Sequence, residues 1–405
     1  MKNKKIVEIN GANYASTGNI MLNIAKQARK QGFEVFTCCQ DSKKARQFNY
    51  DSQIIIGSRF ERLISEKLAA ISGLSGSFNY FSTKSFIKKL KEIKPDLVHL
   101  HIIHDTYINQ KMLFNYLSKN DIPVIWTFHD CWAFTGKCPY FEMDGCDKWK
   151  NGCYNCPQIR KYPESYLFDK SKYLWNKKNK LFNSINYLTI VTPSIWLSNY
   201  VKESFLKNHD IRVINNGINL NIFKPTDSDF RIKNNIEDTF LILGVGYNWS
   251  PRKGLDSFIE LSKRLDDRFK IILVGTNDKI DELLPENIIS IHRTYNQEEL
   301  VKIYSACDLF VNPTSEDNFP TVNIESLACG TPVLTYNTGG SPEIIDDKCG
   351  SVVEKGNIDL LEKKIIRIYE EKPYSRQDCI NRAKCFNAED KFDEYVKLYK
   401  EVLNK

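Results

Sequence analysis

The segment from residue 308 to residue 345 constrains the fold more than any other part of the sequence. It contains in order an apolar run, a polar loop, a helical pattern and a second apolar run, at residues 309–311, 312–319, 320–330 and 331–336. This succession predicts a strand, a loop, a helix and a second strand, the repeating unit of parallel α/β sheets. Such sheets bind ligands at the carboxyl ends of their strands. We therefore expect a ligand site in the loop and at the start of the helix.

Two carboxylates in this segment indicate the chemistry of the ligand. Asp317 lies in the loop, and Glu325 lies on the predicted helix, with seven residues between them. The backbone N–H groups of Phe319, Thr321 and Val322 lie near the helix N-terminus, where unpaired donors favour an anion such as a diphosphate. A single Glu near a helix start could merely complement the helix dipole. The whole segment instead favours a ligand with both hydroxyl and phosphate groups.

The segment resembles the donor-binding signature of the retaining GT-B glycosyltransferases of family 4, also called glycosyl transferases group 1. That signature is an acidic residue, seven residues, a Glu and an ACGTPV-like turn, and it matches Asp317, Glu325 and residues 328–333. Asp317 replaces a more usual Glu, and the neighbouring Glu316 is an alternative for this position. The resemblance implies that Asp317 orients the sugar and that Glu325 holds the ribose hydroxyls. It also implies donor contacts from Asn318, Phe319, Pro320 and Thr321.

The chain has 405 residues, too many for one ordinary hydrophobic core and suitable for two α/β domains. The resemblance implies two Rossmann-like domains that face each other across a cleft. We expect an acceptor domain at residues 1–212 and a donor domain at residues 213–387. A last helix, at residues 388–405, would cross back to the first domain. No run of about 18 apolar residues occurs, and the start of the sequence does not resemble a signal peptide. These features predict a cytoplasmic protein.

Basic residues elsewhere in the expected donor domain predict the rest of the donor site. Arg252 and Lys253 precede a helical pattern at the end of the apolar run 240–245, where both side chains can bind a diphosphate. Family members usually carry an Arg directly after the Gly that ends this strand, and Tyr247 stands there in this chain. The resemblance further implies that Arg293 borders the base pocket and that the turn at Gly18 meets the donor.

One histidine of the expected first domain resembles a family residue that contacts the donor sugar. His129 ends the apolar run that begins at Val124, and the adjacent Asp130 is suited to orient its ring. The alternative is a structural histidine. With Asp317 and Glu325, His129 completes the predicted catalytic residues. His99 and His101 share one face of another strand, but no carboxylate at metal-ligand spacing accompanies them.

An insertion at about 131–160 carries four cysteines within 19 residues, spaced C-x7-C-x6-C-x2-C. In a cytosolic chain this pattern favours a structural zinc site, with reduced or redox-active thiols and disulfides as the alternatives. The ligands would be Cys138, Cys146, Cys153 and Cys156. We expect no cofactor for catalysis, because the only DxD-like sequence, at residues 227–229, lies in a polar loop instead of at a strand end.

The charge is distributed unevenly along the sequence. Residues 1–210 contain 31 Lys and Arg against 18 Asp and Glu, although the net charge of the whole chain is only +7. A basic first half indicates an anionic partner. The amphipathic pattern Arg59–Ile71 and the basic aromatic stretch that follows it, up to Lys94, could lie on an anionic membrane. The alternative is an amphipathic helix that faces the core.

Together these features predict a retaining glycosyltransferase. It would transfer a hexose from a nucleoside diphosphate sugar to a glycan or a lipid-linked glycan in surface polysaccharide biosynthesis. A peripheral position at the inner face of the cell membrane is one candidate location. One alternative is a nucleotide-sugar epimerase on the same fold. Another is a zinc-containing nucleic-acid-binding protein, which is disfavoured because residues 131–156 hold three Lys against three acidic residues. We therefore expect no nucleic-acid partner.

Overall fold

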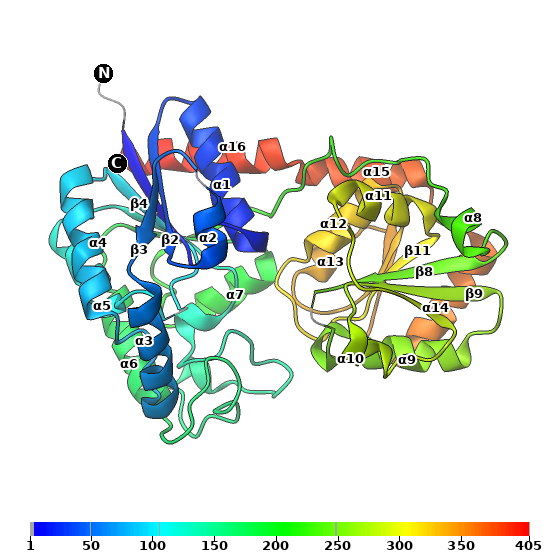
Figure 1. Cartoon of the computed structure of the whole chain (residues 1–405), viewed down its shortest axis with the longest axis horizontal. Coiled ribbons are helices and arrows are strands. Elements are labelled where there is room, and N and C mark those ends of the chain that lie inside the picture. The colour runs from blue at the N-terminus through cyan, green and yellow to red at the C-terminus, as the bar shows by residue number, and fades with distance from the viewer. Residues whose placement is uncertain (1–3, 49, 105, 248, 405) are drawn as a thin grey trace. The chain divides into compact units, whose positions relative to one another are not determined.

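The computed structural model describes residues 4–48, 50–104, 106–247 and 249–404, and it divides the chain into two compact units (Figure 1). The first unit comprises residues 1–214 and 392–405, and the second comprises residues 215–391. Each unit contains one sheet, and the strand pairs of both sheets are parallel. The predicted α/β fold with two Rossmann-like domains is therefore confirmed.

The first unit contains a seven-stranded sheet in the order β3-β2-β1-β4-β5-β6-β7. Its strands are β1 (Lys5–Ile9), β2 (Glu34–Gln40), β3 (Gln53–Ile56), β4 (Leu97–Leu100), β5 (Val124–Thr127), β6 (Leu188–Thr192) and β7 (Asp210–Val213). The strand order reverses at β1, which pairs with β2 on one side and β4 on the other. This pairing places Glu8 of β1 directly opposite His99 of β4.

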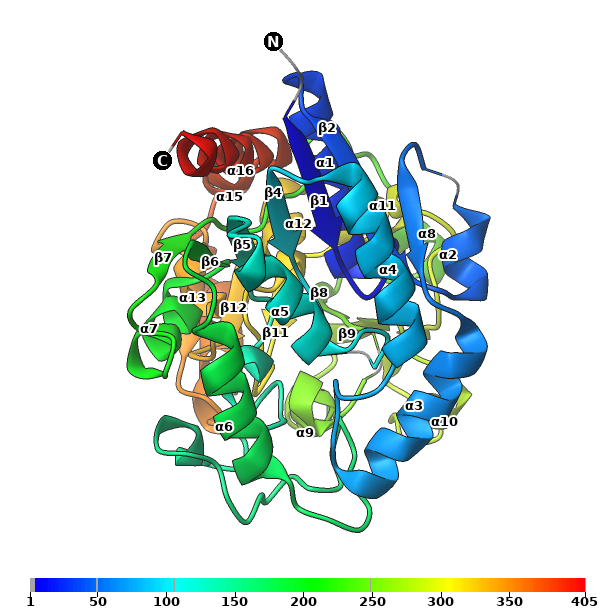
Figure 2. The same ribbon diagram turned by 90° about the vertical axis from the view of Figure 1, so that its left-hand side faces the viewer.

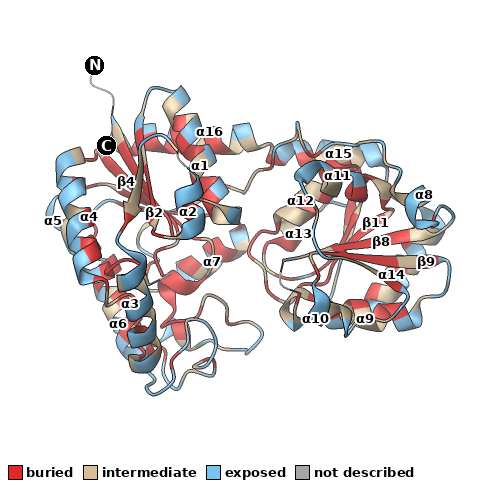
Figure 3. Ribbon diagram, viewed as in Figure 1, coloured by how far each residue is buried: buried red, intermediate tan, exposed pale blue. Residues whose placement is uncertain are grey.

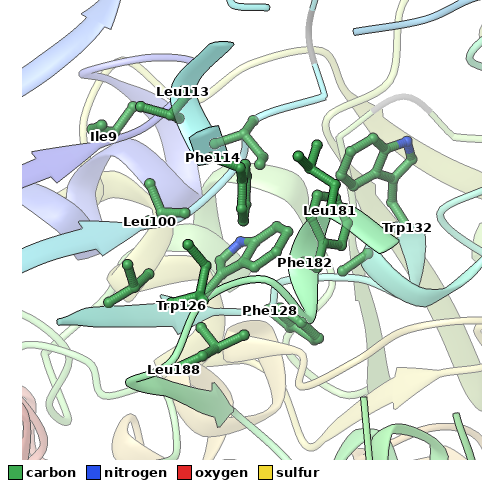
Figure 4. Packing of buried hydrophobic residues seen from close by; sticks show 14 of the residues in the cluster. Ile9, Leu100, Leu113, Phe114, Trp126, Phe128, Trp132, Leu181, Phe182 and Leu188 are labelled. Atoms are coloured by element: carbon green, nitrogen blue, oxygen red, sulfur yellow. The ribbon is translucent and has the colours of Figure 1, made fainter. Parts of the chain in front are cut away.

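Helices cover this sheet, and Figure 2 looks onto the face that α4, α5 and α6 cover. The helices of the unit are α1 (Ala15–Lys30), α2 (Lys43–Gln47), α3 (Arg59–Ser72), α4 (Tyr80–Ile93), α5 (Gln110–Lys119), α6 (Ser171–Phe182), α7 (Ile195–Glu203) and α16 (Ala388–Leu403). Aromatic rings fill the core between sheet and helices. The ring centroid of Trp126 lies 5.5 Å from that of Phe114 and 4.8 Å from that of Phe182 (Figure 4). These contacts join β5 to α5 and α6.

The second unit contains a six-stranded sheet in the order β10-β9-β8-β11-β12-β13. Its strands are β8 (Phe240–Val245), β9 (Phe269–Val274), β10 (Ile288–Ile291), β11 (Leu309–Asn312), β12 (Val333–Tyr336) and β13 (Gly350–Val353). Its helices are α8 (Phe230–Asn234), α9 (Leu255–Arg264), α10 (Asp278–Asp281), α11 (Gln297–Ala306), α12 (Thr321–Ala328), α13 (Ser341–Ile344), α14 (Ile358–Glu371) and α15 (Arg376–Ala383). The strand order reverses between β8 and β11, the kind of position at which α/β sheets bind ligands.

The segment from β11 to β12 follows its predicted pattern closely. Pro320 is the N-cap of α12 and fits there because the first helical positions need no backbone hydrogen-bond donor. Gly330 follows the helix with φ +84°, a left-handed conformation that glycine adopts without strain. The sequence therefore sets both ends of this helix.

The apolar residues of α3 face solvent and not the core. The exposed fractions of Phe60, Leu63, Ile64, Leu68 and Ile71 range from 42% to 76%, and Figure 3 shows the exposure along the helix. Only the small residues Ser65 and Ala69 of this helix are buried. The alternative of a core-facing helix is thus wrong. Within the described residues, no helix combines the length and apolar character that a membrane crossing requires.

Candidate functional site

The loop at residues 313–320 lies at the carboxyl end of β11, and glycines allow other backbone segments to approach it closely. A Cβ atom at Gly339 would lie 1.6 Å from the Asp317 carbonyl oxygen, and one at Gly254 would lie 2.3 Å from the Pro313 carbonyl oxygen. The Gly340 N–H also donates to the Asn318 carbonyl at 2.8 Å. The loop is therefore held between the Gly339-Gly340 turn and the start of α9.

The structure brings the predicted phosphate-binding residues to this loop. Lys253 Nζ lies 2.5 Å from Asp317 Oδ2, and both side chains are mostly buried. Arg252 Nη1 donates to the Glu316 carbonyl at 2.9 Å, while the Ser315 N–H donates to the Arg252 carbonyl at 2.9 Å. Two cations and a carboxylate are thus positioned next to the N-terminus of α12.

Asn318 and Phe319 lead into α12 and are both buried. The Phe319 ring lies in the apolar core, 5.7 Å from the ring of Phe386. Thr321 begins the helix, and Pro320 before it provides no side-chain cap for the first N–H groups. This part of the chain can therefore offer backbone donors to an anion, whereas the Phe319 ring serves packing.

Glu325 lies on α12, and two hydroxyl groups bind its carboxylate. The Tyr304 hydroxyl donates to Oε2 at 3.2 Å, and the Thr321 side chain also bonds the carboxylate. Burial raises the pKa of Glu325 to about 7, although both hydrogen bonds act to lower it. Asn312 and Asn323 fix the helix to β11 through a buried hydrogen bond of 2.8 Å. Glu325 is thus a rigidly held acceptor that titrates near neutral pH.

Arg293 lies away from this group within the second unit, and Gly18 belongs to the first unit. Arg293 is exposed in the segment after β10, an edge strand that β9 and β8 separate from β11. Gly18 lies in the first unit on α1, where a Cβ atom would be 2.9 Å from the Ala12 carbonyl oxygen. Close packing of the preceding loop against the helix accounts for that glycine.

His129 follows β5 in the first unit and contacts a second histidine. Its Nε2 lies 3.1 Å from Nδ1 of His101. Burial lowers the pKa of His129 to about 4, and the charge of Asp130 opposes this shift only in part. The carboxylate of Asp130 lies 3.1 Å from Nε2 of His104 and accepts the Trp132 N–H. His129 is therefore a neutral imidazole at pH 7.

A buried polar network continues behind His129. His101 Nε2 lies 3.8 Å from Glu8 Oε2, and Glu8 Oε1 accepts the Tyr399 hydroxyl at 3.1 Å. His99 bonds Tyr399 at 2.6 Å and Thr127 at 2.8 Å through its two ring nitrogens. Burial raises the pKa of Glu8 to about 8, so its carboxyl group is largely protonated at neutral pH.

The spacing of the histidines does not indicate Glu8, because this carboxylate lies on a different strand, far from them in the sequence. Glu8, His99 and His101 bring three ligand atoms within 4.8 Å of one another. Both nitrogens of His99 already have protein partners, so this cluster does not fit a metal ion without losing those bonds. The signal in the sequence that could have indicated this site was Glu8, a charged residue among the apolar residues of β1.

The four predicted metal ligands line one small pocket in the first unit. None of the twelve cysteines of the chain forms a disulfide in this structure. Burial raises the pKa of Cys138 to about 12 and that of Cys153 to about 11. Without a bound cation these two thiols are therefore protonated at neutral pH.

Comparison with known proteins agrees with this architecture. The profile of "Glycosyltransferase Family 4" matches residues 17–222, and that of "Glycosyl transferases group 1" matches residues 226–386. The "Putative colanic acid biosynthesis glycosyl transferase WcaC" of Escherichia coli is 24% identical over 272 residues, which are 65% of this chain and 65% of that protein. A GDP-mannose-dependent phosphatidylinositol monomannoside mannosyltransferase of Corynebacterium glutamicum is 24% identical over 47% of this chain and 55% of its own length.

Solved structures share the fold over nearly the whole chain. A sucrose-phosphate synthase of Thermosynechococcus elongatus matches 99% of this chain and 100% of its own, with a TM-score of 0.72 and 16% identity. Anabaena HepE, solved in complex with UDP-glucose, matches 98% of this chain and 99% of its own, with a TM-score of 0.67 and 14% identity.

Proposed function

Because the chain belongs to glycosyltransferase family 4, we propose that it transfers a hexose from a nucleoside diphosphate sugar to a glycan or lipid-linked glycan hydroxyl, with retention of the anomeric configuration. The observation that carries this proposal is the group formed by Arg252, Lys253 and Asp317 at the start of α12. Cations, backbone donors and a carboxylate at the end of a parallel strand suit a ligand with both a diphosphate and a sugar.

The groups that bind the diphosphate would make the largest contribution to lowering the reaction barrier. Breaking the bond between sugar and diphosphate leaves negative charge on the phosphate oxygens, and preorganised donors stabilise that charge. Lys253 has three N–H donors, so it can bind a phosphate oxygen while it keeps Asp317 in place. Arg252 is held through the Glu316 carbonyl, and its guanidinium would face the diphosphate.

The remaining roles concern orientation. Glu325 would accept hydrogen bonds from the ribose hydroxyls, and Asp317 would orient a sugar hydroxyl. His129, whose pKa burial lowers to about 4, would act as a neutral hydrogen-bonding group toward the sugar and not as a cation. We assign no enzymic nucleophile and no metal ion to the transfer step.

Two observations support a surface glycan or glycolipid as the acceptor. The names of the relatives refer to colanic acid biosynthesis and to a mannosyltransferase that acts on a phosphatidylinositol mannoside. The first unit also exposes the apolar residues of α3, and α4 beside it carries exposed Lys84, Lys88 and Lys91. We therefore place the reaction at the inner face of the cell membrane, with the protein bound peripherally.

A screen of nucleoside diphosphate sugars by thermal shift tests the proposal. A donor at 100 times its dissociation constant should stabilise the protein by about 2.7 kcal/mol. With that donor, NMR of the product should show the anomeric configuration of the donor, and nucleotide release should depend on added acceptor. Release or interconversion of the sugar without an acceptor would instead indicate an epimerase. If no nucleotide stabilises the protein, the proposal fails.

A further inference from the structure

The segment at residues 131–158 starts two residues after His129 and folds around the pocket that Cys138, Cys146, Cys153 and Cys156 line. Its regular structure is limited to two single 3-10 turns, at Trp132–Phe134 and Lys148–Lys150. Phe141 and Trp149 form apolar walls of the pocket. Cys138 and Cys153 are buried, while Cys146 and Cys156 are half-buried. The four cysteines therefore line one pocket, and two of them are buried in it.

Backbone donors already point at two of the sulfur atoms. The Gly136 N–H donates to Cys153 Sγ at 3.1 Å, and the backbone of Gln158 bonds the sulfur of Cys156. A Cβ atom at Gly136 would lie 2.9 Å from the Cβ of Cys153, so only glycine allows this approach. Hydrogen bonds from N–H groups stabilise negative charge on sulfur, as a metal-bound thiolate requires.

Two buried lysines surround the same thiols. Lys178 of α6 is 2% exposed and donates to the Trp132 and Thr135 carbonyls at 2.7 and 3.0 Å. Lys137 is 5% exposed and donates to three backbone carbonyls in one short segment, those of Gln158, Ile159 and Lys161. In the described part of the chain, neither ammonium group lies within 4.0 Å of a carboxylate oxygen. A buried charge without a counter-charge costs several kcal/mol.

The cysteine sulfurs are the nearby groups that can provide the negative charge for these lysines. Burial lowers the pKa of Lys178 and of Lys137. Among the charges that oppose this shift, those of Cys138 and Cys153 come first at Lys178, and those of Cys156 and Cys138 come first at Lys137. Asp130, Asp169 and Glu164 contribute less. Protonated thiols would supply no charge. Four thiolates on a divalent cation carry a net charge of −2, which two ammonium groups balance.

We propose that Cys138, Cys146, Cys153 and Cys156 bind one zinc ion and that Lys137 and Lys178 are the buried counter-charges of this zinc–thiolate centre. In the described part of the chain, no three of these four sulfur atoms lie within 4.8 Å of one another. In a tetrahedral site with Zn–S bonds of about 2.3 Å, sulfurs lie about 3.8 Å apart. Zinc binding therefore draws the four side chains inward.

The centre would order the chain next to His129. Lys178 holds the carbonyls of Trp132 and Thr135, and the Trp132 N–H bonds Asp130. The ammonium of Lys178 also lies 3.4 Å from the centre of the Trp132 ring. The zinc has a structural role in this arrangement, because four thiolates leave no open coordination position. The inference does not depend on the proposed reaction.

Metal analysis of full-length protein purified without added zinc tests the site. We expect close to one zinc per chain, and replacement by Co²⁺ should give the thiolate-to-cobalt absorption of a tetrahedral site. The double variant Cys146→Ser/Cys156→Ser should lose the metal. Cys131→Ala, which removes a cysteine of the same segment outside the set, should retain it. Protein that contains no zinc, takes up none at equimolar concentration and reacts freely at all four thiols would overturn the proposal.

A chelator competition tests the role of the lysines. Lys178→Met and Lys137→Met should each weaken zinc binding at least tenfold, whereas Lys178→Arg should restore most of the affinity. The matched control is Lys150→Met, since Lys150 is exposed and pairs with Glu203. If a methionine variant does not fold, the zinc affinity of Lys178→Arg against Lys178→Gln gives the same comparison. Unchanged affinity in folded methionine variants would refute the counter-charge role.

Discussion

At the scale of single residues, the candidate donor site depends on a few polar contacts that the chain makes over long sequence distances. Lys253 and Asp317 are 64 residues apart and form an ion pair of 2.5 Å. Because both side chains retain some exposure, solvent weakens this pair, and its contribution to stability is small. The value of the contact lies in positioning an ammonium group next to the N-terminus of α12.

Replacement of Lys253 by Ala should weaken binding of a nucleoside diphosphate by roughly 1.5–3 kcal/mol, the usual contribution of a hydrogen bond to a charged group. The loss of a positive charge next to the diphosphate is the physical reason. Isothermal titration calorimetry measures the effect. Lys263→Ala on the exposed side of α9 is the matched control and should bind as the parent does. Equal affinities of the parent and Lys253→Ala would remove Lys253 from the site.

Glu325 should couple nucleotide binding to proton release. Its pKa is raised from 4.5 to about 7 by burial, so the folded protein holds the proton more tightly than the unfolded chain. The stability from this group is complete below pH 4.5 and is lost as the pH rises to about 7. In the proposed complex the ribose hydroxyls would donate to the ionised carboxylate, so affinity should be about tenfold weaker at pH 6 than at pH 8.

Calorimetry at pH 6 in buffers with different ionisation enthalpies measures this proton release. The variant Glu325→Gln keeps the shape of the side chain but cannot titrate, so it separates the contribution of Glu325 from the titration of the nucleotide phosphates. Proton release that is identical in the parent and in Glu325→Gln would contradict the prediction.

At the scale of elements, α3 is unusual because its large apolar residues are exposed. We define the α3–α4 surface as Phe60, Leu63, Ile64, Leu68, Ile71 and Phe81, all of which are exposed. The Glu61 carboxylate accepts the N–H groups of Phe81 and Ser82, which fixes the start of α4 to the start of α3. An exposed apolar surface next to several lysines suits an anionic lipid bilayer.

Sedimentation with anionic vesicles tests this surface. The protein should bind at low salt and be released at 1 M salt, where the screening length falls to about 3 Å. Phe60→Ser/Phe81→Ser should bind less because apolar area no longer enters the bilayer, and Lys88→Glu/Lys91→Glu should bind less because the charge is reversed. The control is Leu283→Ser, which removes an exposed apolar residue of the second unit. Absence of binding to vesicles of any composition would exclude the membrane role.

The elements also show which parts of the structure the sequence could predict. The strand β11, the start of α12 and the glycine after it were predictable because proline, glycine and apolar periodicity act locally. The contact between Glu8 and His101 was not, since it depends on the register between β1 and β4, which are about 90 residues apart. The outward orientation of α3 was not predictable either, because an amphipathic pattern does not indicate what its apolar side faces.

The same distinction applies to the candidate site. The position of Lys253 before a helix and the resemblance at Asp317 predicted these two residues, but only the structure shows that they contact each other. The spacing of four cysteines suggested a metal, whereas Lys178, which comes from a helix further along the chain, became relevant only through its burial and its hydrogen bonds. Arg293 was named by resemblance alone, and the structure leaves it exposed after an edge strand.

At the scale of the whole molecule, the second unit is continuous in sequence and has its own core. Residues 215–391 form a complete six-stranded sheet with helices, and the first unit needs two separate segments of chain. The apolar core of the second unit includes Phe310, Ile324 and Val333, which belong to the elements on either side of the loop at residues 313–320. We expect the second unit to fold alone and the first unit to depend on α16.

A fragment of residues 215–391 should therefore be folded and should bind the nucleoside diphosphate with an affinity within about tenfold of the full chain, because the predicted phosphate ligands all lie in it. Circular dichroism and calorimetry measure folding and binding. A fragment of residues 1–214 should be unfolded or aggregated, since it exposes the surface that Tyr395 and Tyr399 cover. A fragment 215–391 that folds but binds no nucleotide would contradict the assignment of the donor site.

The position of α16 also determines when the first unit can be completed during protein synthesis. Tyr399 bonds Glu8 and His99, so the buried network of the first unit includes residues translated nearly 400 positions apart. A ribosome must therefore finish the second unit before the segment that completes the first can leave the exit tunnel. Until then Glu8 and His99 lack their partner Tyr399, and the incomplete first unit is the part of the nascent chain that chaperones and proteases would meet.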